Sequence, residues 1–460
     1  RLYSAVKSVS DYAISLGVNI PTGKDSLSMT QKYPDGTKVL SPGTVIISAA
    51  AETSDIRNVI KPAAIKDLSS ELVFINFCEG TNLSGSSFYQ TLSNLGVDVT
   101  NTKGGEDIKK IFKTIQEMII SNMIMSGHDI SSGGFITSIL EMNFPNLSHG
   151  MELNLDSFKE DDIIKILFNE SPGIIIQTHN DGINYLKDNR IEFLSLGKVI
   201  EERKLKINHN SKYIELDIDY LRDVWYKTSH LLDNEQTRKE DSLSRFKNYK
   251  KQPLKFNFPN SFNGKLKKKS YKKNIKAVVI REKGINSERE MAYMLHLTGF
   301  QVKDVHMTDL VSGRETLEDI NMIVFPGGFS NSDVLGSAKG WAGAFKFNSR
   351  AKKAIEGFYK RKNTLSLGVC NGCQLMMELN LIDKKLENNH PKMEYNNSKK
   401  FECSFSSIDI LESNSIMLKN LSGNTLGIWL AHGEGKFNLK NSDVDVAAKF
   451  HYNEYPGNPN

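Results

Sequence analysis

The chain has 460 residues and a formal net charge of +5, with 39% apolar and 25% charged residues. These values are ordinary for a globular protein and exclude wholesale disorder and a collagen-like structure; the length suggests about three domains. The longest apolar runs, such as residues 45–51, fall far short of the ~20 residues that span a bilayer, and the start does not resemble a signal peptide. Four cysteines are too few for a disulfide scaffold, which favours a reducing, cytoplasmic setting.

Residues 1–230 mix candidate strands and helices in the manner of an α+β domain. Short runs of apolar residues between turn residues indicate strands, and apolar residues at helical spacing indicate helices. The expected strands are residues 45–50, 72–77, 122–125 and 174–177. The expected helices lie near residues 84–95, 105–120, 133–142, 160–168 and 181–188.

Two loops in this first half carry groups that suit phosphate or metal. Residues 21–29 place Lys24, Asp25 and Ser26 beside a glycine, so the loop could bind phosphate through backbone N–H groups and Lys24. Its spacing is not that of a P-loop. Residues 127–134 place Asp129 and Ser131 before two glycines, where Mg²⁺ or phosphate could bind. The alternative for this second loop is a helix start capped by Asp129 or Ser131. A third loop of small residues, 83–87, is weak evidence alone.

The strongest shift in composition lies between residues 233 and 275, which are rich in Lys, Asn and Ser and show no clear periodicity. Such a segment is typical of an exposed linker. The alternative is a basic patch for nucleic acid, but Tyr271 is the only aromatic residue among its clustered lysines. We therefore expect a solvated linker and no nucleic-acid partner.

Beyond the linker, strands alternate with helices. Strands are expected at residues 277–280, 302–307, 322–325 and 364–369. Helices are expected through residues 291–295, 338–360 and 372–379. This order is typical of βαβ units around a parallel sheet, and so predicts an α/β fold.

The sharpest motif in the chain is Gly-Val-Cys-Asn-Gly-Cys-Gln at residues 368–374, between the last expected strand and the last expected helix. It predicts a sharp strand-turn-helix elbow that carries Cys370 as a nucleophile. A helix dipole contributes about 0.3–1 kcal/mol, up to ~2, which leaves a thiol that starts near 8.5 at a pKa of roughly 7.5. An activated thiolate therefore needs a cationic partner as well, most naturally a histidine.

Three other interpretations of Cys370 remain open. With Cys373 it forms a C-x-x-C, which could be a redox pair or half of a zinc site, and it could also be a buried structural cysteine. In favour of the nucleophile, residues 325–330 end the preceding strand in a Gly-Gly pair. A backbone N–H near Gly328 and that of Asn371 could together form an oxyanion hole. The alternative for the Gly-Gly pair is an ordinary turn.

These motifs together resemble a class I glutamine amidotransferase domain, and most closely the glutaminase domain of the large single-chain phosphoribosylformylglycinamidine synthases. Matching stretches cover residues 275–460; they lie at 281–286, 304–310, 326–330, 333–336, 368–374, 431–435 and 455–460. In the first half, the three loops and residues 221–225 resemble the aminoimidazole-ribonucleotide-synthetase-like modules of that family. Ser132, Tyr395 and Ser404 depart from the family pattern.

The resemblance implies a domain order and a fold for each part. Residues 1–55 are the expected tail of a synthetase-like nucleotide-binding domain, and 56–225 a synthetase-like C-terminal domain. Residues 226–274 are the expected linker, and 275–460 a truncated amidotransferase domain with a flavodoxin-like open sheet. Because the chain starts at Arg1 rather than Met and stops at Asn460 without a closing element, we expect a fragment that is inactive alone.

The resemblance also implies a catalytic base. His432 and Glu434 have the H-x-E spacing of a base and its orienting acid, but in the family this stretch precedes the catalytic pair. We therefore expect the catalytic His and Glu beyond Asn460; the alternative is that His432 and Glu434 serve.

The activity implied is the ATP-dependent amidation of formylglycinamide ribonucleotide to formylglycinamidine ribonucleotide, with ammonia taken from glutamine. Cys370 is the implied nucleophile, Asp129 the implied Mg²⁺ ligand and Ser131 the implied nucleotide contact, and the amidotransferase part is expected to dock on the rest of its own chain. Two rival functions are a non-catalytic docking or nucleotide-binding module and a stand-alone cysteine hydrolase with a flavodoxin-like fold.

Overall fold

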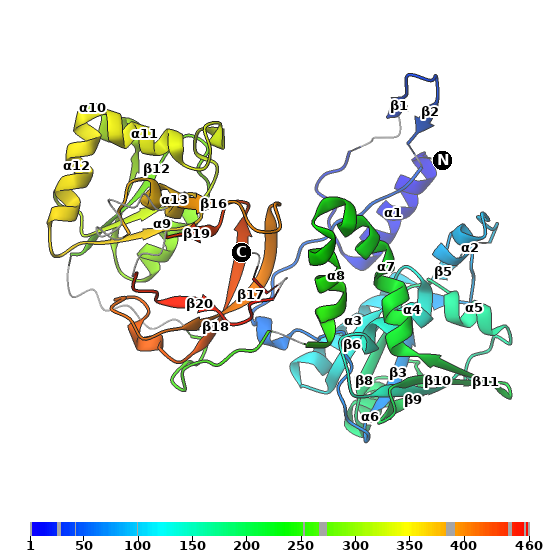
Figure 1. The fold of residues 1–460 in the computed structure, drawn as a ribbon. Coiled ribbons are helices and arrows are strands. Elements are labelled where there is room, and N and C mark those ends of the chain that lie inside the picture. Colours follow the sequence, from blue (N-terminus) through cyan, green and yellow to red (C-terminus); the bar gives the residue numbers. More distant parts are fainter. Residues whose placement is uncertain are drawn as a thin grey trace. The chain divides into compact units, whose positions relative to one another are not determined.

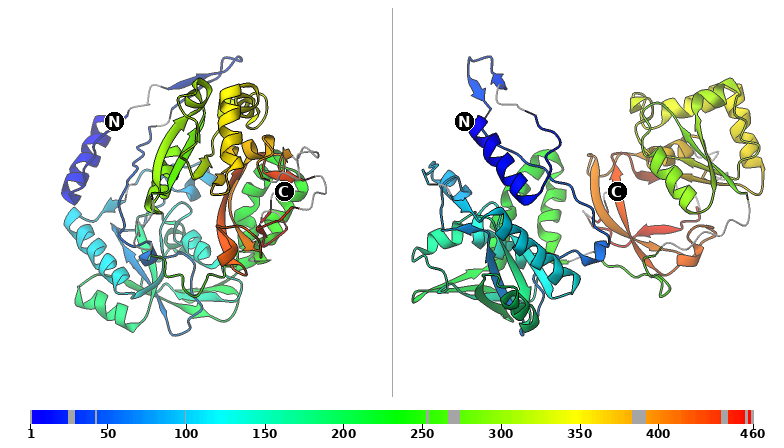
Figure 2. Two further views of the ribbon diagram at one scale, coloured as in Figure 1. Left: turned by 90° about the vertical axis from the view of Figure 1, so that its left-hand side faces the viewer. Right: turned by 180° about the vertical axis from the view of Figure 1, so that it is seen from behind.

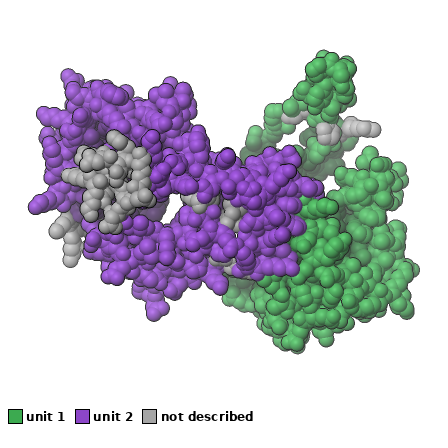
Figure 3. All heavy atoms as spheres, viewed as in Figure 1, with its two compact units in different colours: residues 1–227 green, residues 228–460 purple. Residues whose placement is uncertain are grey.

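The computed structural model divides into two compact units, residues Arg1–Lys227 and Thr228–Asn460 (Figure 3). Each unit is described by itself. The structure describes residues 2–24, 29–41, 43–98, 100–251, 254–265, 274–382, 392–439, 444–454 and 457–458. Within these residues, no helix is long and apolar enough to cross a membrane.

The first unit is built on a seven-stranded, largely antiparallel sheet in the order β11-β10-β7-β9-β3-β8-β6 (Figure 1). Only β10 and β7 pair in parallel. The strands are β3 (Glu71–Asn76), β6 (Ile124–Asp129), β7 (Gly150–Asn154), β8 (Gly173–Thr178), β9 (Leu194–Ile200), β10 (Lys204–His209) and β11 (Lys212–Asp217). The α+β class predicted for this part is thus confirmed.

Helices cover this sheet because its strands are apolar on the faces that meet them. On one face, α4 (Gly134–Asn143) and α5 (Ile163–Phe168) pack on Leu72, Phe74 and the inward residues of β7 and β10. On the other face, α3 (Gly105–Ile120) and α6 (Asn180–Asp188) pack on Val73, Ile75 and Ile176. The two apolar layers hold the loops at the strand ends in place.

The remaining elements of the first unit are short or lie outside this core. They are α1 (Leu2–Leu16), β1 (Thr30–Lys32), β2 (Lys38–Leu40), η1 (Ile56–Asn58), β4 (Cys78–Glu79), α2 (Ser87–Thr91) and β5 (Asn101–Thr102). The strand predicted at residues 45–50 is wrong: these residues form no strand and are exposed, with Ile46 85% accessible. An apolar run becomes a strand only when a neighbour pairs with it, and no described residue does so here.

The second unit contains a four-stranded parallel sheet in the order β13-β12-β14-β15. Its strands are β12 (Lys276–Arg281), β13 (Gln301–His306), β14 (Met322–Phe325) and β15 (Leu365–Gly368). Helix α9 (Glu288–Leu297) covers one face, and α10 (Met307–Ser312), α11 (Lys339–Phe347), α12 (Ser349–Lys360) and α13 (Asn371–Glu378) cover the other. This confirms the predicted open α/β sheet. The loops at its carboxyl edge, where such sheets bind ligands, follow β12, β14 and β15.

The single helix predicted for residues 338–360 is two helices. Asn348 has extended backbone angles, and its side-chain oxygen accepts hydrogen bonds from the N–H groups of Arg350 and Ala351 at 3.1 and 2.9 Å. It therefore ends α11 and caps α12. Asparagine is a favoured N-cap because this side chain satisfies N–H groups that the first turn leaves free.

A second, antiparallel sheet follows in the order β18-β17-β20, drawn orange to red in Figure 2. Its strands are β17 (Glu402–Ile410), β18 (Thr425–His432) and β20 (Ala448–Phe450); nearby lie the pair β16 (Lys392–Glu394) and β19 (Lys436–Asn438), η3 (Ser330–Asp333) and η5 (Lys419–Leu421). The sheet brings His432, at the end of β18, opposite Glu402 at the start of β17.

The segment 226–274 differs from the linker that its composition predicts. It contains the end of α7 (Ile218–Gln236), all of α8 (Lys239–Asn248) and η2 (Tyr249–Lys251). Residues 228–251, called the helical arm below, pack on other parts of the second unit: Asp233 is buried and bonds Lys400 at 3.1 Å. Further on, Asn257 pairs with Thr425 of β18. Long-range ion pairs, invisible to local periodicity, hold this segment. Residues 266–273 of the predicted linker lie outside the described residues.

Candidate functional site

The turn between β15 and α13 has the elbow geometry that the sequence predicts. Cys370 adopts φ 50° and ψ −112°, and Asn371 is the first residue of α13. A backbone of this kind is strained for a non-glycine residue and costs about 1–3 kcal/mol. Gly372 allows the start of α13 to pass close to the end of β14, because a Cβ there would lie 1.9 Å from the Phe325 carbonyl oxygen. The fold thus holds Cys370 at the edge of the sheet, where the residue is exposed although its sulfur is partly desolvated.

The backbone N–H groups of Asn371 and Gly328 lie near enough to the Cys370 sulfur to lower the pKa of its thiol. These are the two positions at which the sequence predicted oxyanion donors. Gly328 has φ 136°, and its approach to the chain after β12 is so close that a Cβ would lie 2.7 Å from the Ile285 Cα. The structure therefore brings a thiol and two N–H donors to one point.

The pKa of the Cys370 thiol is raised, chiefly by burial of the sulfur and further by the Asp333 carboxylate, while the N–H groups of Asn371 and Gly328 lower it. Burial raises the pKa of Cys373 to about 11. Cys373 is therefore the less reactive of the two, and both cysteines are free thiols. Cys370 remains protonated at neutral pH until another group takes its proton.

The side chain of Asn371 ties the elbow to the loop after β14. Its Oδ1 accepts from the Ser330 N–H at 3.1 Å, and its Nδ2 donates to Asp333 at 3.1 and 3.3 Å and to Gln374 at 2.9 Å. Asn331, Ser332 and Asp333 all have positive φ, so this loop is held in a strained form. Sequence reasoning assigned no role to Asp333, although it quoted residues 333–336 for the resemblance.

A turn at residues 431–435 lies against the elbow. The Cys370 sulfur donates to the Ala431 carbonyl at 3.5 Å, and Gln374 Nε2 donates to the Glu434 carbonyl at 2.8 Å. The His432 ring is bonded through Nδ1 to the amide oxygen of Asn396 at 2.9 Å, and burial lowers the pKa of this histidine. The side chain that orients His432 is thus an amide rather than the carboxylate of Glu434.

The predicted phosphate loop at residues 21–29 is described only in part. Lys24 is exposed, whereas Asp25 and Ser26 lie outside the described residues. Their proposed contact with a nucleotide remains a prediction.

The second predicted loop, residues 127–134, joins β6 to α4. Asp129 ends β6 with its side chain 75% accessible, and Ser131 accepts the Gly134 N–H through its carbonyl at 3.0 Å. The expected loop at 83–87 lies beside it, because Glu170 Oε1 accepts from the N–H groups of Gly133 (2.7 Å) and Ser87 (2.9 Å). The Glu170 carboxylate thus accepts from the Gly133 N–H, a donor that a phosphate bound at the start of α4 would use. Sequence analysis missed it, because Glu170 is 37 residues away from Gly133.

The residues around Asp129 could bind Mg²⁺ together with a nucleotide, but they do not form a complete set of metal ligands by themselves. Among the described residues, no group of three or more His, Cys, Asp or Glu side chains could hold a metal ion. Mg²⁺ commonly keeps several waters and takes one or two carboxylates together with substrate phosphates. The exposed carboxylate of Asp129 fits that kind of site.

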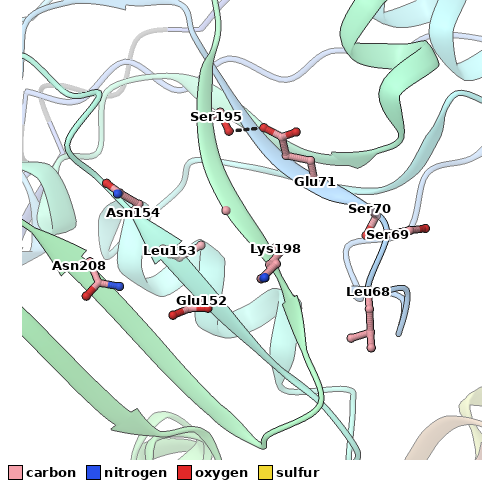
Figure 4. Close-up of a pocket in the computed structure, with 11 residues that line it drawn as sticks. Leu68, Ser69, Ser70, Glu71, Glu152, Leu153, Asn154, Ser195, Lys198 and Asn208 are labelled. Atoms are coloured by element: carbon pink, nitrogen blue, oxygen red, sulfur yellow. Dashed lines mark hydrogen bonds between the residues drawn. The ribbon is translucent and has the colours of Figure 1, made fainter.

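Two cavities of the first unit lie elsewhere. One, of about 490 Å³, opens on the sheet between Asn154, Lys198 and Asn208, beside the hydrogen bond between Ser195 and Glu71 (Figure 4). The other, of about 630 Å³, is lined by Phe74, Phe135, Phe158 and Phe193 and by charged side chains that include Lys103 and Glu160. Neither is lined by a predicted site residue.

Comparison with known families finds three domain matches along the chain. Residues 274–460 match the CobB/CobQ-like glutamine amidotransferase domain. Residues 1–52 match the FGAR-AT PurM_N-like domain, and residues 80–210 match the C-terminal domain of AIR synthase related proteins.

Curated relatives match almost the whole chain. A probable phosphoribosylformylglycinamidine synthase of Arabidopsis thaliana is 35% identical over 457 residues, which are 95% of this chain and 32% of the relative. The Dictyostelium discoideum phosphoribosylformylglycinamidine synthase is 33% identical over 477 residues, 95% of this chain and 35% of the relative. The chain thus spans about a third of the length of the curated relatives that it matches.

Solved structures from Thermotoga maritima also match. PurLQS is 26% identical, covering 39% of this chain and 75% of its own, with a TM-score of 0.32. PurL complexed with ATP is 14% identical, covering 47% of this chain and 35% of its own, with a TM-score of 0.32. By the domain matches and the curated relatives, the chain is similar to the phosphoribosylformylglycinamidine synthases, and its residues 274–460 are similar to a glutamine amidotransferase domain.

Proposed function

We propose that residues 274–460 release ammonia from glutamine, and that the whole protein uses it to convert formylglycinamide ribonucleotide into formylglycinamidine ribonucleotide at the expense of ATP. The observation that carries the proposal is the position of Cys370 on a strained elbow at the start of α13, where the N–H groups of Asn371 and Gly328 act on its thiol. The domain matches and the curated relatives support it.

In the proposed reaction, the Cys370 sulfur attacks the side-chain amide carbon of glutamine and forms a C–S bond. The N–H groups of Asn371 and Gly328 then stabilise the negative oxygen. The C–N bond breaks, and the nitrogen leaves as ammonia with the proton that the base took from the thiol. Water hydrolyses the γ-glutamyl thioester, which yields glutamate and restores the thiol.

The thiol proton must be removed before attack, because burial raises the pKa of Cys370. His432 is a poor candidate for this base, since its ring is bonded to Asn396, and the group of this turn that meets the Cys370 sulfur is the Ala431 carbonyl. We therefore propose that the catalytic His and Glu come from another part of the full-length protein, and that His432 and Glu434 do not form the catalytic pair.

For the second reaction we propose that Asp129 is a Mg²⁺ ligand, and that Ser131, Lys24, Asp25 and Ser26 contact a nucleotide. When bound, Mg²⁺ would balance phosphate charge. The exposed Asp129 carboxylate beside Ser131 supports this proposal. We also propose a cytoplasmic location, and docking of the amidotransferase domain on the rest of its own chain so that ammonia passes between sites.

The test is covalent labelling of the full-length protein with a diazo-ketone analogue of glutamine, followed by peptide mass spectrometry. We expect the label on Cys370 and its loss in Cys370→Ser, while Cys373→Ser labels as the parent does. Labelling of Cys373, or no labelling, would contradict the nucleophile assignment. The latter result would favour a non-catalytic docking module.

A further inference from the structure

We propose that Asn396 is a positioning residue of the amidotransferase site: it holds the turn at residues 431–435 against Cys370, and the helical arm holds Asn396 in place. The inference rests on the proposed function in one respect only, that Cys370 is the nucleophile. It adds a residue outside the elbow and a link from the helical arm to the turn.

Asn396 is 1% exposed, and three of its four side-chain hydrogen bonds go to this turn. Its Oδ1 accepts from His432 Nδ1 at 2.9 Å and from the Gly435 N–H at 3.2 Å. Its Nδ2 donates to the His432 carbonyl at 2.8 Å and to the Lys400 carbonyl at 3.1 Å. Its backbone N–H donates to the Gly433 carbonyl at 2.9 Å.

Only an amide satisfies all four of these side-chain partners. Two of them are donors and two are carbonyl oxygens, so the site needs two acceptor positions and two N–H groups on one short side chain. The two carbonyls also fix which end of the amide is Nδ2. Because Oδ1 only accepts, His432 carries its proton on Nδ1 and leaves Nε2 as an acceptor.

The turn that Asn396 holds contacts the elbow at two points. The Ala431 carbonyl accepts from the Cys370 sulfur, and the Glu434 carbonyl accepts from Gln374, which in turn bonds Asn371. A displacement of the turn would therefore change the surroundings of the sulfur and of one oxyanion donor. Reaction rates respond strongly to such displacements, since a 1 Å shift can cost about a hundredfold.

The helical arm holds the segment that follows Asn396. Asp233, which is 8% exposed, pairs with Lys400 at 3.1 Å and with Arg245 at 3.6 Å. Arg245 also pairs with the buried Glu402 at 3.7 Å, the residue opposite His432 in the sheet. The Thr237 hydroxyl donates to the Ser398 carbonyl at 3.4 Å. Loss of one partner leaves a buried charge uncompensated, so the segment must move.

The first test replaces Asn396 in the full-length protein and measures the labelling of Cys370 by the diazo-ketone analogue as a function of its concentration. Asn396→Asp keeps both acceptors and removes both donors. We expect the maximal labelling rate to fall about tenfold or more with little change in the concentration for half-saturation, because the displaced turn meets the sulfur and one oxyanion donor, which act in the chemical step. The neighbouring Asn397→Ala is the matched control, since it is exposed and loses only a bond to Lys436.

Two further readouts separate positioning from general damage to the fold. In Asn396→Asp the new carboxylate faces the Nδ1–H of His432, so the NMR titration of that imidazole should move to higher pH. Asp233→Asn should slow the labelling of Cys370 as well. Asp241→Asn should not: Asp241 is buried in the same arm, but its carboxylate accepts from Arg238 of the arm itself, at 2.7 and 2.9 Å.

The outcomes are distinct. If Cys370 is not labelled in the parent protein, the proposed function fails. If the parent is labelled, but Asn396→Asp and Asp233→Asn react at the parental rate, the positioning role is wrong. Equal slowing by Asp233→Asn and Asp241→Asn would also overturn it, by showing that the arm acts through stability alone. Should Asn396→Asp fail to fold, the labelling rates of Asp233→Asn and Asp241→Asn still test the positioning role.

Discussion

The amide of Asn371 donates to both carboxylate oxygens of Asp333, at 3.1 and 3.3 Å. The bond joins the residue after the nucleophile to the strained loop after β14. The same carboxylate also acts on the thiol, since its charge raises the pKa of Cys370. Asp333 thus has a structural effect and an electrostatic effect at one site, and the two can be separated.

We expect Asp333→Asn to make Cys370 more reactive toward a simple neutral alkylating agent. Loss of the negative charge lowers the pKa of the thiol, so a larger share is thiolate at a given pH. The rate of iodoacetamide alkylation, measured across pH, should have its midpoint at lower pH than in the parent protein. Asp309→Asn is the control, since Asp309 pairs with Arg314 at the surface. An unchanged or higher midpoint in Asp333→Asn would contradict the electrostatic role.

A pair of glycine substitutions tests the packing of the elbow. In Gly372→Ala the new methyl group would lie 1.9 Å from the Phe325 carbonyl, so the turn must shift, at a cost of about 1–3 kcal/mol or more. Gly357, in the interior of α12, has no neighbouring atom within 4 Å, so Gly357→Ala should stabilise by about 0.5–1 kcal/mol. Denaturant unfolding measures both. Equal changes in the free energy of unfolding for the two variants would show that Gly372 is not closely packed against Phe325.

The loop of Asp129 allows a test of nucleotide binding. We expect Asp129→Asn to weaken Mg²⁺-dependent binding of a nucleotide by the full-length protein, while Asp188→Asn, an exposed carboxylate at the end of α6, leaves it unchanged. Titration calorimetry with and without Mg²⁺ measures this. If phosphate binds at the start of α4, Glu170→Gln should strengthen binding, because it removes a negative charge from the Gly133 N–H. Weaker binding in Glu170→Gln would place the phosphate elsewhere.

The sequence predicted the local geometry well wherever that geometry depends on neighbouring residues. The elbow follows from glycines on both sides of Cys370, and the parallel sheet follows from the regular alternation of strands and helices. The predicted strand at 45–50 failed because pairing depends on a partner strand. The single helix at 338–360 failed because Asn348, which looks neutral in a helical pattern, caps a new helix.

The parts of the site that sequence reasoning missed depend on contacts between distant residues. Asn396 lies 36 residues before His432, and Asp233 lies 167 residues before Lys400. Glu170 lies in the connection between α5 and β8, and its side chain reaches the start of α4. Each is a polar residue whose role follows from the group that it meets in the fold, so no local spacing could have indicated it.

The most direct test of the central claim is steady-state hydrolysis of glutamine by the full-length protein, with glutamate release as the readout. We predict that Cys370→Ser abolishes hydrolysis, whereas Cys373→Ser, with its buried thiol of high pKa, retains it. Retained hydrolysis in Cys370→Ser, or its loss in Cys373→Ser alone, would contradict the assignment of Cys370 as the nucleophile.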